Sequence, residues 1–118
     1  MTETDKKYDL EERTFLFAKQ IRNFVKIIPR TQSNIEDSKQ LIRSSGSIAA
    51  NYIEANNSLS KKDFVMRIRI SRKEAKESML WLKLLEVLDI KLINEQKRLI
   101  NEASELLMIL SAIMRKAE

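Results

Sequence analysis

Apolar residues recur every three or four positions over four stretches of the chain, which is the spacing of one face of an α-helix. The first stretch predicts a helix over residues 10–28. It should end there because Pro29 lacks a backbone N–H and disfavours helical geometry in the residue before it. The packed face of this helix should contain Thr14, Phe17, Ala18, Ile21, Phe24, Val25 and Ile28.

The second stretch predicts a helix over residues 34–56 that begins with a capping box of Ser33 and Glu36. Residues 44–53 carry no charged side chain, although the outer face of a helix in a monomer is normally charged. We therefore expect a neighbouring subunit to cover this helix, the alternative being a plain uncharged surface. The core face should hold Ile35, Ile42, Ala49, Tyr52 and Ile53, and the covered side Ser44, Ser47 and Asn51.

The third stretch predicts the longest helix, over residues 61–88, with Ser60 as its capping residue. Its core face should contain Phe64, Ile68, Ser71, Ala75, Ser78, Leu82 and Leu85. A second apolar line, rotated by roughly a third of a turn, contains Met66, Ile70, Trp81, Leu84 and Leu88. We expect this second line to form a subunit interface, the alternative being one very wide core stripe.

The fourth stretch predicts a helix over residues 94–115, which carries Leu99, Ala103, Leu106, Leu110 and Ile113 on one face. Helices joined by such short connections pack against one another in antiparallel order. The pattern therefore predicts an all-α protein with a single domain over residues 1–118, folded as an antiparallel up-and-down four-helix bundle.

The composition narrows the chemistry that this bundle can perform. The chain has no cysteine and no histidine, which removes disulfides, thiolate zinc sites and the most common general base. Its first five residues include two acidic and no basic side chains, where a signal peptide would be basic and then apolar. No segment approaches the roughly 20 apolar residues that span a membrane. We therefore expect a cytoplasmic protein without a cofactor, a bound metal or a membrane partner.

Basic residues concentrate on the predicted third helix. Residues 61–76 hold seven basic and two acidic side chains, an excess equal to the net charge of +5 of the whole chain. Such a line could bind the phosphates of RNA or DNA, with no sign of base-specific reading because no aromatic residue accompanies it. The alternative is a solvated helix face. The candidate nucleic-acid-binding residues are Lys62, Arg69, Arg72, Lys73, Lys76 and Lys83.

Other polar residues suggest structure more than catalysis. We interpret Asn51, Glu54, Arg72, Glu74 and Glu77 as a network of hydrogen bonds and ion pairs that fixes helix register, the alternative being a functional polar site. Two carboxylate pairs, Glu74 with Glu77 and Glu102 with Glu105, loosely resemble the metal sites of all-α nucleotide pyrophosphohydrolases. A shared magnesium ion would need all four to converge, and Glu105 is expected to project away from the core face. We therefore expect no enzyme.

Three segments in order carry a family resemblance: residues 43–55, 60–64 and 69–78. They resemble the bacterial four-helix-bundle family that includes proteins encoded in intervening sequences of 23S ribosomal RNA genes. The likeness covers about residues 8–88, and the fourth helix matches by pattern alone. Many members have glycine after the motif glutamate, where this chain has Ala55, so the second helix could extend slightly.

The resemblance implies an up-and-down bundle, commonly assembled as a ring of five. It also implies kinship with the accessory variability proteins of diversity-generating retroelements, which bind nucleic acid and a reverse transcriptase. Together with the basic line, this leads us to expect a non-enzymatic homo-oligomer, a pentamer by preference, that binds RNA or DNA through the third helix. The alternative is a protein-interaction scaffold without a nucleic-acid role.

Overall fold

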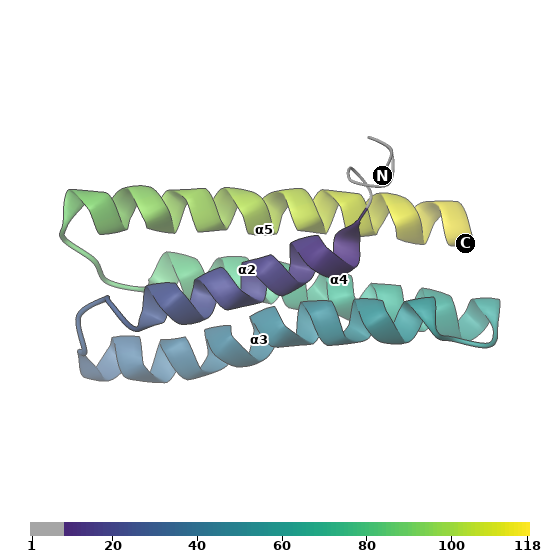
Figure 1. The fold of residues 1–118 in the computed structure, drawn as a ribbon, viewed down its shortest axis with the longest axis horizontal. Helices are drawn as coiled ribbons and strands as arrows, with labels where there is room; N and C mark the ends of the chain where they lie inside the picture. Colours follow the sequence, from purple (N-terminus) through teal and green to yellow (C-terminus); the bar gives the residue numbers. More distant parts are fainter. Residues whose placement is uncertain (1–8) are drawn as a thin grey trace.

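Four α-helices follow one another in antiparallel order in the computed structural model, which describes residues 9–118 (Figure 1). Neighbouring helices pack in a ring, since each contacts the next along the chain and α5 closes back on α2. This is the antiparallel up-and-down bundle that the sequence predicts. The acidic residues 1–5 lie outside the described part. The helices are α2 (Leu10–Val25), α3 (Gln32–Asn56), α4 (Lys61–Leu84) and α5 (Ile90–Ala117).

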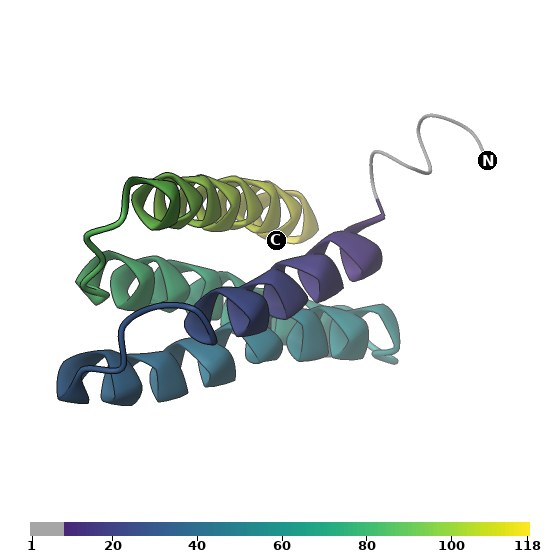
Figure 2. The same cartoon turned by 60° about the vertical axis from the view of Figure 1, so that its left-hand side comes forward.

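The four sides of the bundle are not equally packed. The α3–α4 pair has the most extensive contact and the α2–α5 pair the least. Figure 2 shows the reason, because the shorter α2 crosses the bundle obliquely while α3, α4 and α5 run along its length. The described chain is 45 Å long, 30 Å wide and 19 Å thick.

The core confirms the predicted faces of three helices. Phe17, Ile21 and Phe24 of α2 are at most 1 % exposed. On α4 the predicted face is buried apart from Phe64, which is half-buried, and on α5 it is buried apart from Ile113. The remaining large, fully buried apolar side chains are Leu41, Ile48, Ile68, Leu82, Leu99, Leu106 and Leu110.

The predicted face of α3 is wrong for its isoleucines at both ends, although Tyr52 packs against the core as predicted. Ile35 and Ile53 are 40 % and 44 % exposed, whereas Leu41 and Ile48 are fully buried. The buried face also holds two fully buried serines, Ser44 and Ser45. The prediction from large apolar side chains therefore assigned the core to the wrong face of α3. The true core face carries several small hydroxyl residues, which that pattern does not detect.

Several helix ends differ from the predicted ones. α2 stops at Val25, although Ile28 stays buried beyond it. The cap of α3 is Thr31, whose hydroxyl accepts the N–H of Asn34 at 3.1 Å, so the predicted Ser33 capping box is wrong. The cap of α4 is Ser60, as predicted.

The connection between α4 and α5 begins four residues earlier than predicted. α4 ends at Leu84 because Gln96 of α5 donates to the carbonyls of Leu82 and Leu85, which satisfies the end of the helix. Asp89 then caps α5 by accepting the backbone N–H groups of residues 91 and 92. Within residues 9–118, no helix is both long and apolar enough to cross a membrane.

Candidate functional site

The predicted basic line lies mostly on the open surface of α4. Five of its six residues are exposed. Arg69 pairs with Glu118 of α5 at 2.8 Å. Within the described residues, the four lysines have no acidic partner, so their charges are available to an external anion. We call the exposed residues the basic stripe: Lys62, Arg69, Lys73, Lys76 and Lys83.

Arg72 lies apart from the exposed basic stripe, so its assignment as a nucleic-acid-binding residue stays a prediction. It is half-buried, and its Nε donates to the Ser111 hydroxyl of α5 at 2.7 Å. The side chain therefore helps to join α4 to α5. Arg72 lies on the side of α4 that faces α5, and it is less exposed than the neighbouring residues of the basic stripe.

Two shallow apolar grooves lie beneath the basic stripe. One, of about 480 Å³, has Leu80 and Leu107 as its floor, with Lys73, Lys76 and Lys83 among its lining residues. The other, of about 620 Å³, lies where Lys62 and Arg69 approach the end of α5. The stripe thus combines cations with exposed apolar side chains such as Leu80, which is 50 % exposed.

A continuous polar network crosses the α3–α4 contact. Its centre is Glu74 of α4, whose side chain is 8 % exposed. Its carboxylate accepts from both terminal nitrogens of Arg43, at 3.2 and 3.3 Å, and from the Ser47 hydroxyl at 3.3 Å. These bonds favour the cation and raise the pKa of Arg43, mainly through the hydrogen bonds that Arg43 donates to Glu74. The network therefore gives the buried Glu74 carboxylate three hydrogen-bond donors from α3.

The network continues in both directions along the two helices. Arg43 also reaches Glu77 at 3.4 Å. Ser47 accepts from Asn51, and Asn51 accepts from Arg67 of α4 at 3.2 Å. Asn51, Glu74 and Glu77 thus lie in the predicted network.

Two predicted members lie elsewhere, and three members were not predicted. Glu54 is exposed and Arg72 faces α5. Arg43, Ser47 and Arg67 are the members that the sequence interpretation missed. The spacing of Arg43, Ser47 and Asn51 at i and i+4 could have revealed the first two, since it places them on one flank of α3.

The polar interface residues of α3 face their own chain. Ser44 is fully buried, and its hydroxyl lies 2.8 Å from that of Ser78 on α4. The prediction that Ser44 contacts another subunit is therefore wrong, because α4 of the same chain covers it. Ser47 and Asn51 are half-buried within the network just described. The uncharged stretch of α3 is thus explained by a close α3–α4 contact.

The second apolar line on α4 divides into two groups. Trp81 is half-buried and packs against the core of its own chain, with its indole N–H buried and no acceptor among residues 9–118. Ile70 is also half-buried. Met66 and Leu84 are 44 % and 47 % exposed. Leu88 is 92 % exposed but follows the end of α4, so it does not extend the line.

The two carboxylate pairs lie on opposite flanks of the bundle. Glu102 and Glu105 of α5 both accept from Arg13 of α2, at distances of 2.7 to 2.8 Å. The hydrogen bonding of Arg13 to the Glu102 carboxylate, opposed by desolvation, raises the pKa of Arg13. Glu74 and Glu77 face α3 instead. The four carboxylates therefore do not converge, and residues 9–118 contain no acidic cluster suited to a metal ion.

Comparisons with known proteins place this bundle in a family. The family described as 23S rRNA-intervening sequence protein matches residues 6–112. The chain belongs to the 23S rRNA-intervening sequence protein family. The match spans all of α2, α3 and α4 and most of α5, so it confirms the resemblance and extends it into the fourth helix.

A solved relative supports the family and its fold. It is the crystal structure of a protein of unknown function from the S23 ribosomal protein family of Bacteroides thetaiotaomicron. It is 32 % identical, covers 88 % of this chain and 96 % of its own, and superposes with a TM-score of 0.77. No curated protein matches the chain. This 23S rRNA-intervening sequence protein thus belongs with relatives whose activity is not established.

Proposed function

We propose that this protein is a non-enzymatic, homo-oligomeric adaptor of the cytoplasm that binds RNA or DNA through the basic stripe on α4. The observation that carries the proposal is the exposure of Lys62, Lys73, Lys76 and Lys83 on one side of one helix, without acidic partners in the described part of the chain. Phosphates are bound chiefly by such cations, which release counterions when they are neutralised.

The geometry of the stripe suits a backbone better than a single phosphate group. Lys62 and Lys83 are 21 residues apart, which places them about 31 Å apart along the helix axis. Cations spread over that length can contact several successive phosphates. The shallow grooves beneath them add apolar contacts but offer no hydrogen-bonding pattern for particular bases. We therefore expect affinity for nucleic acid with little sequence preference.

Assembly into a ring would strengthen this binding. Met66 and Leu84 leave apolar surface exposed on the outer side of α4, where a second copy could cover it. Several stripes in one assembly would then contact the same strand, which raises the effective affinity without new contacts. A pentamer remains our preferred assembly, on the family resemblance.

Two variants of equal charge test the proposal. Lys73→Glu with Lys76→Glu reverses two stripe charges, and Lys19→Glu with Lys91→Glu reverses two exposed lysines on α2 and α5. The stripe variant should bind mixed RNA at least tenfold more weakly. The slope of log K against log salt should become shallower by about 1.4 to 1.8, since each of the two lost phosphate contacts contributes about 0.7 to 0.9. The control variant should keep the slope of the unmodified protein.

Filter binding or fluorescence anisotropy at several salt concentrations measures both quantities. Equal losses in the two variants would mean that net charge, and not the stripe, causes binding. An affinity that does not depend on salt would reject the nucleic-acid role. The protein-interaction scaffold would then be the better interpretation, with the groove around Leu80 as its contact surface.

A further inference from the structure

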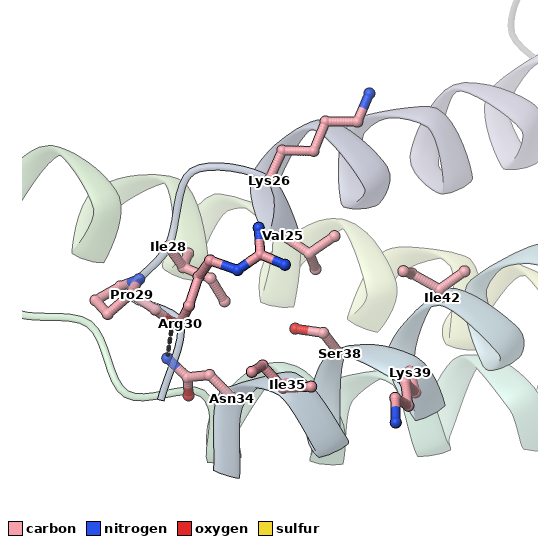
Figure 3. A pocket seen from close by; sticks show the side chains of 10 residues that line it. All are labelled: Val25, Lys26, Ile28, Pro29, Arg30, Asn34, Ile35, Ser38, Lys39 and Ile42. Atoms are coloured by element: carbon pink, nitrogen blue, oxygen red, sulfur yellow. Dashed lines mark hydrogen bonds between the residues drawn. The ribbon is translucent and has the colours of Figure 1, made fainter. Parts of the chain in front are cut away.

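A pocket apart from the two grooves of the basic stripe lies where α2 ends and α3 begins (Figure 3). It has a volume of about 270 Å³ and is separate from the basic stripe, since none of its lining residues belongs to α4. Its floor is apolar and comes from both helices and the turn between them. The apolar lining residues are Val25, Ile28, Pro29, Ile35 and Ile42.

The pocket is built on a fixed turn. Asn34, which is 1 % exposed, donates to the carbonyls of Pro29 and Glu86 at 3.0 and 2.9 Å. Its carbonyl oxygen accepts the N–H of Glu86 at 2.9 Å. One amide therefore ties the turn after α2 to the connection between α4 and α5. Because both connections are held together, the pocket shape does not depend on a free loop.

The rim of the pocket is positively charged. Lys26, Arg30 and Lys39 line it, and none of its ten lining residues is acidic. Figure 3 shows Arg30 extending from the turn across the pocket, toward the side where Val25 and Ser38 lie. Lys39 pairs with Glu36 at 3.1 Å, whereas Lys26 and Arg30 have no ion-pair partner among residues 9–118. Two cations thus face solvent beside an apolar floor.

We propose that this pocket docks a short acidic segment of a partner protein, which inserts one or two aliphatic side chains between its carboxylates. The charge of the rim selects an anionic partner, and the exposed Ile35, at 40 %, offers apolar surface to an inserted side chain. The pocket volume of about 270 Å³ is small for a small-molecule site, which typically has roughly 300–1,000 Å³, and it suits one or two aliphatic side chains of a peptide.

Nucleic acid is the less suitable occupant of this pocket. Its phosphates would meet two or three cations at most, and its polar sugar edges would have to cover the aliphatic floor of Ile35 and Ile42. A leucine flanked by carboxylates matches both the cationic rim and the aliphatic floor of the pocket. The inference does not depend on the proposed role of α4, because a peptide could bind here whether or not the basic stripe binds RNA.

The test uses the full chain and defined probes. A blocked hexapeptide with two central leucines and two acidic residues on each side is titrated into ¹⁵N-labelled protein, followed by amide chemical shifts. Two matched peptides replace the leucines by serine or the acidic residues by lysine. The acidic leucine peptide should shift the amides around Val25, Ile35 and Ile42, with binding in the millimolar range expected for so few contacts. Neither matched peptide should do so.

Two variants and a control locate the site. Arg30→Glu and Ile35→Ser should each weaken peptide binding about tenfold, and both positions are exposed enough for the fold to persist. Arg115→Glu, an exposed change on α5, should leave binding unaltered. Three results would overturn the proposal: peptide shifts confined to α4, single-stranded RNA that competes at this pocket, or a lower native mass of Ile35→Glu, which would make the pocket a contact between copies of the chain.

Discussion

Glu74 illustrates how one buried charge can join two helices. Its side chain is almost inaccessible to water, and its three hydrogen bonds all come from Arg43 and Ser47 of α3. Glu77 contacts the same arginine once, at 3.4 Å, and is 39 % exposed. Removing one partner of a buried pair leaves polar groups without partners, whereas an exposed pair exchanges its contact for water. The two glutamates should therefore contribute unequally to stability.

Glu74→Ala should lower the free energy of unfolding by about 1–3 kcal/mol, because the Ser47 hydroxyl and Arg43 lose their acceptor. Glu77→Ala should cost less than about 1 kcal/mol, as is typical of an exposed ion pair. Urea unfolding followed by circular dichroism measures both. Equal losses would mean that the network depends on Arg43 as a whole and not on the buried carboxylate.

The basic stripe was predictable residue by residue, with one exception. Helical spacing places Lys62, Lys73 and Lys76 on one side of α4, and all are exposed. Arg72 differs because a long side chain can turn toward a neighbouring helix, where the Ser111 hydroxyl accepts a hydrogen bond from its Nε. No pattern within α4 could indicate a hydroxyl on α5, so this position required the three-dimensional structure.

The helices as elements were largely predictable, but the orientation of α3 was not. Apolar periodicity predicted all four helices. Large apolar residues dominate the buried faces of α2 and α5, and on α4 Ile68 and Leu82 mark the face that also buries Ser71 and Ser78. On α3 the core face includes Ser44 and Ser45, and the hydroxyl of Ser44 finds a partner on α4. A serine is assigned to a core face through its apolar neighbours, and on α3 the exposed Ile35 and Ile53 indicated a different face. The prediction therefore assigned the wrong side of α3 to the core. As a result, it assigned Ser44, which contacts α4 of the same chain, to a subunit interface.

The N-terminal cap of α3 could not be predicted from the local sequence either. Ser33 with Glu36 has the spacing of a capping box, yet the chain uses Thr31, two residues earlier. The earlier start brings Asn34 into the position where it ties two connections together. Long-range hydrogen bonds thus decided between two local motifs.

Thr31→Ala should destabilise the protein by about 1 kcal/mol, the usual loss when a helix cap is removed. Ser33→Ala should change stability by less than about 0.5 kcal/mol, because the exposed hydroxyl donates to the exposed Glu86 side chain. Thermal or urea unfolding of the two variants gives the comparison. A larger loss for Ser33→Ala would restore the predicted capping box.

The whole molecule leaves apolar side chains uncovered on its outer side. The sequence analysis placed Trp81 in a subunit interface, but this residue packs against the core of its own chain. Trp81→Asp would therefore disturb the fold itself. Met66 and Leu84 are better probes because both are nearly half exposed on α4. Any ring of copies that uses the outer side of α4 must bury them, and it must leave the lysines of the stripe open to bind phosphates.

Met66→Glu with Leu84→Glu should therefore convert the native assembly to monomers, since burying two charges in an apolar contact costs several kcal/mol. The helical content should persist, because neither residue belongs to the core. Phe15→Glu with Leu16→Glu is the matched control on α2, with side chains 56 % and 42 % exposed, and it should leave the mass unaltered. Light scattering after size-exclusion chromatography measures each mass. A monomeric unmodified protein would refute the ring, and an unchanged mass in the α4 variant would move the interface to another helix.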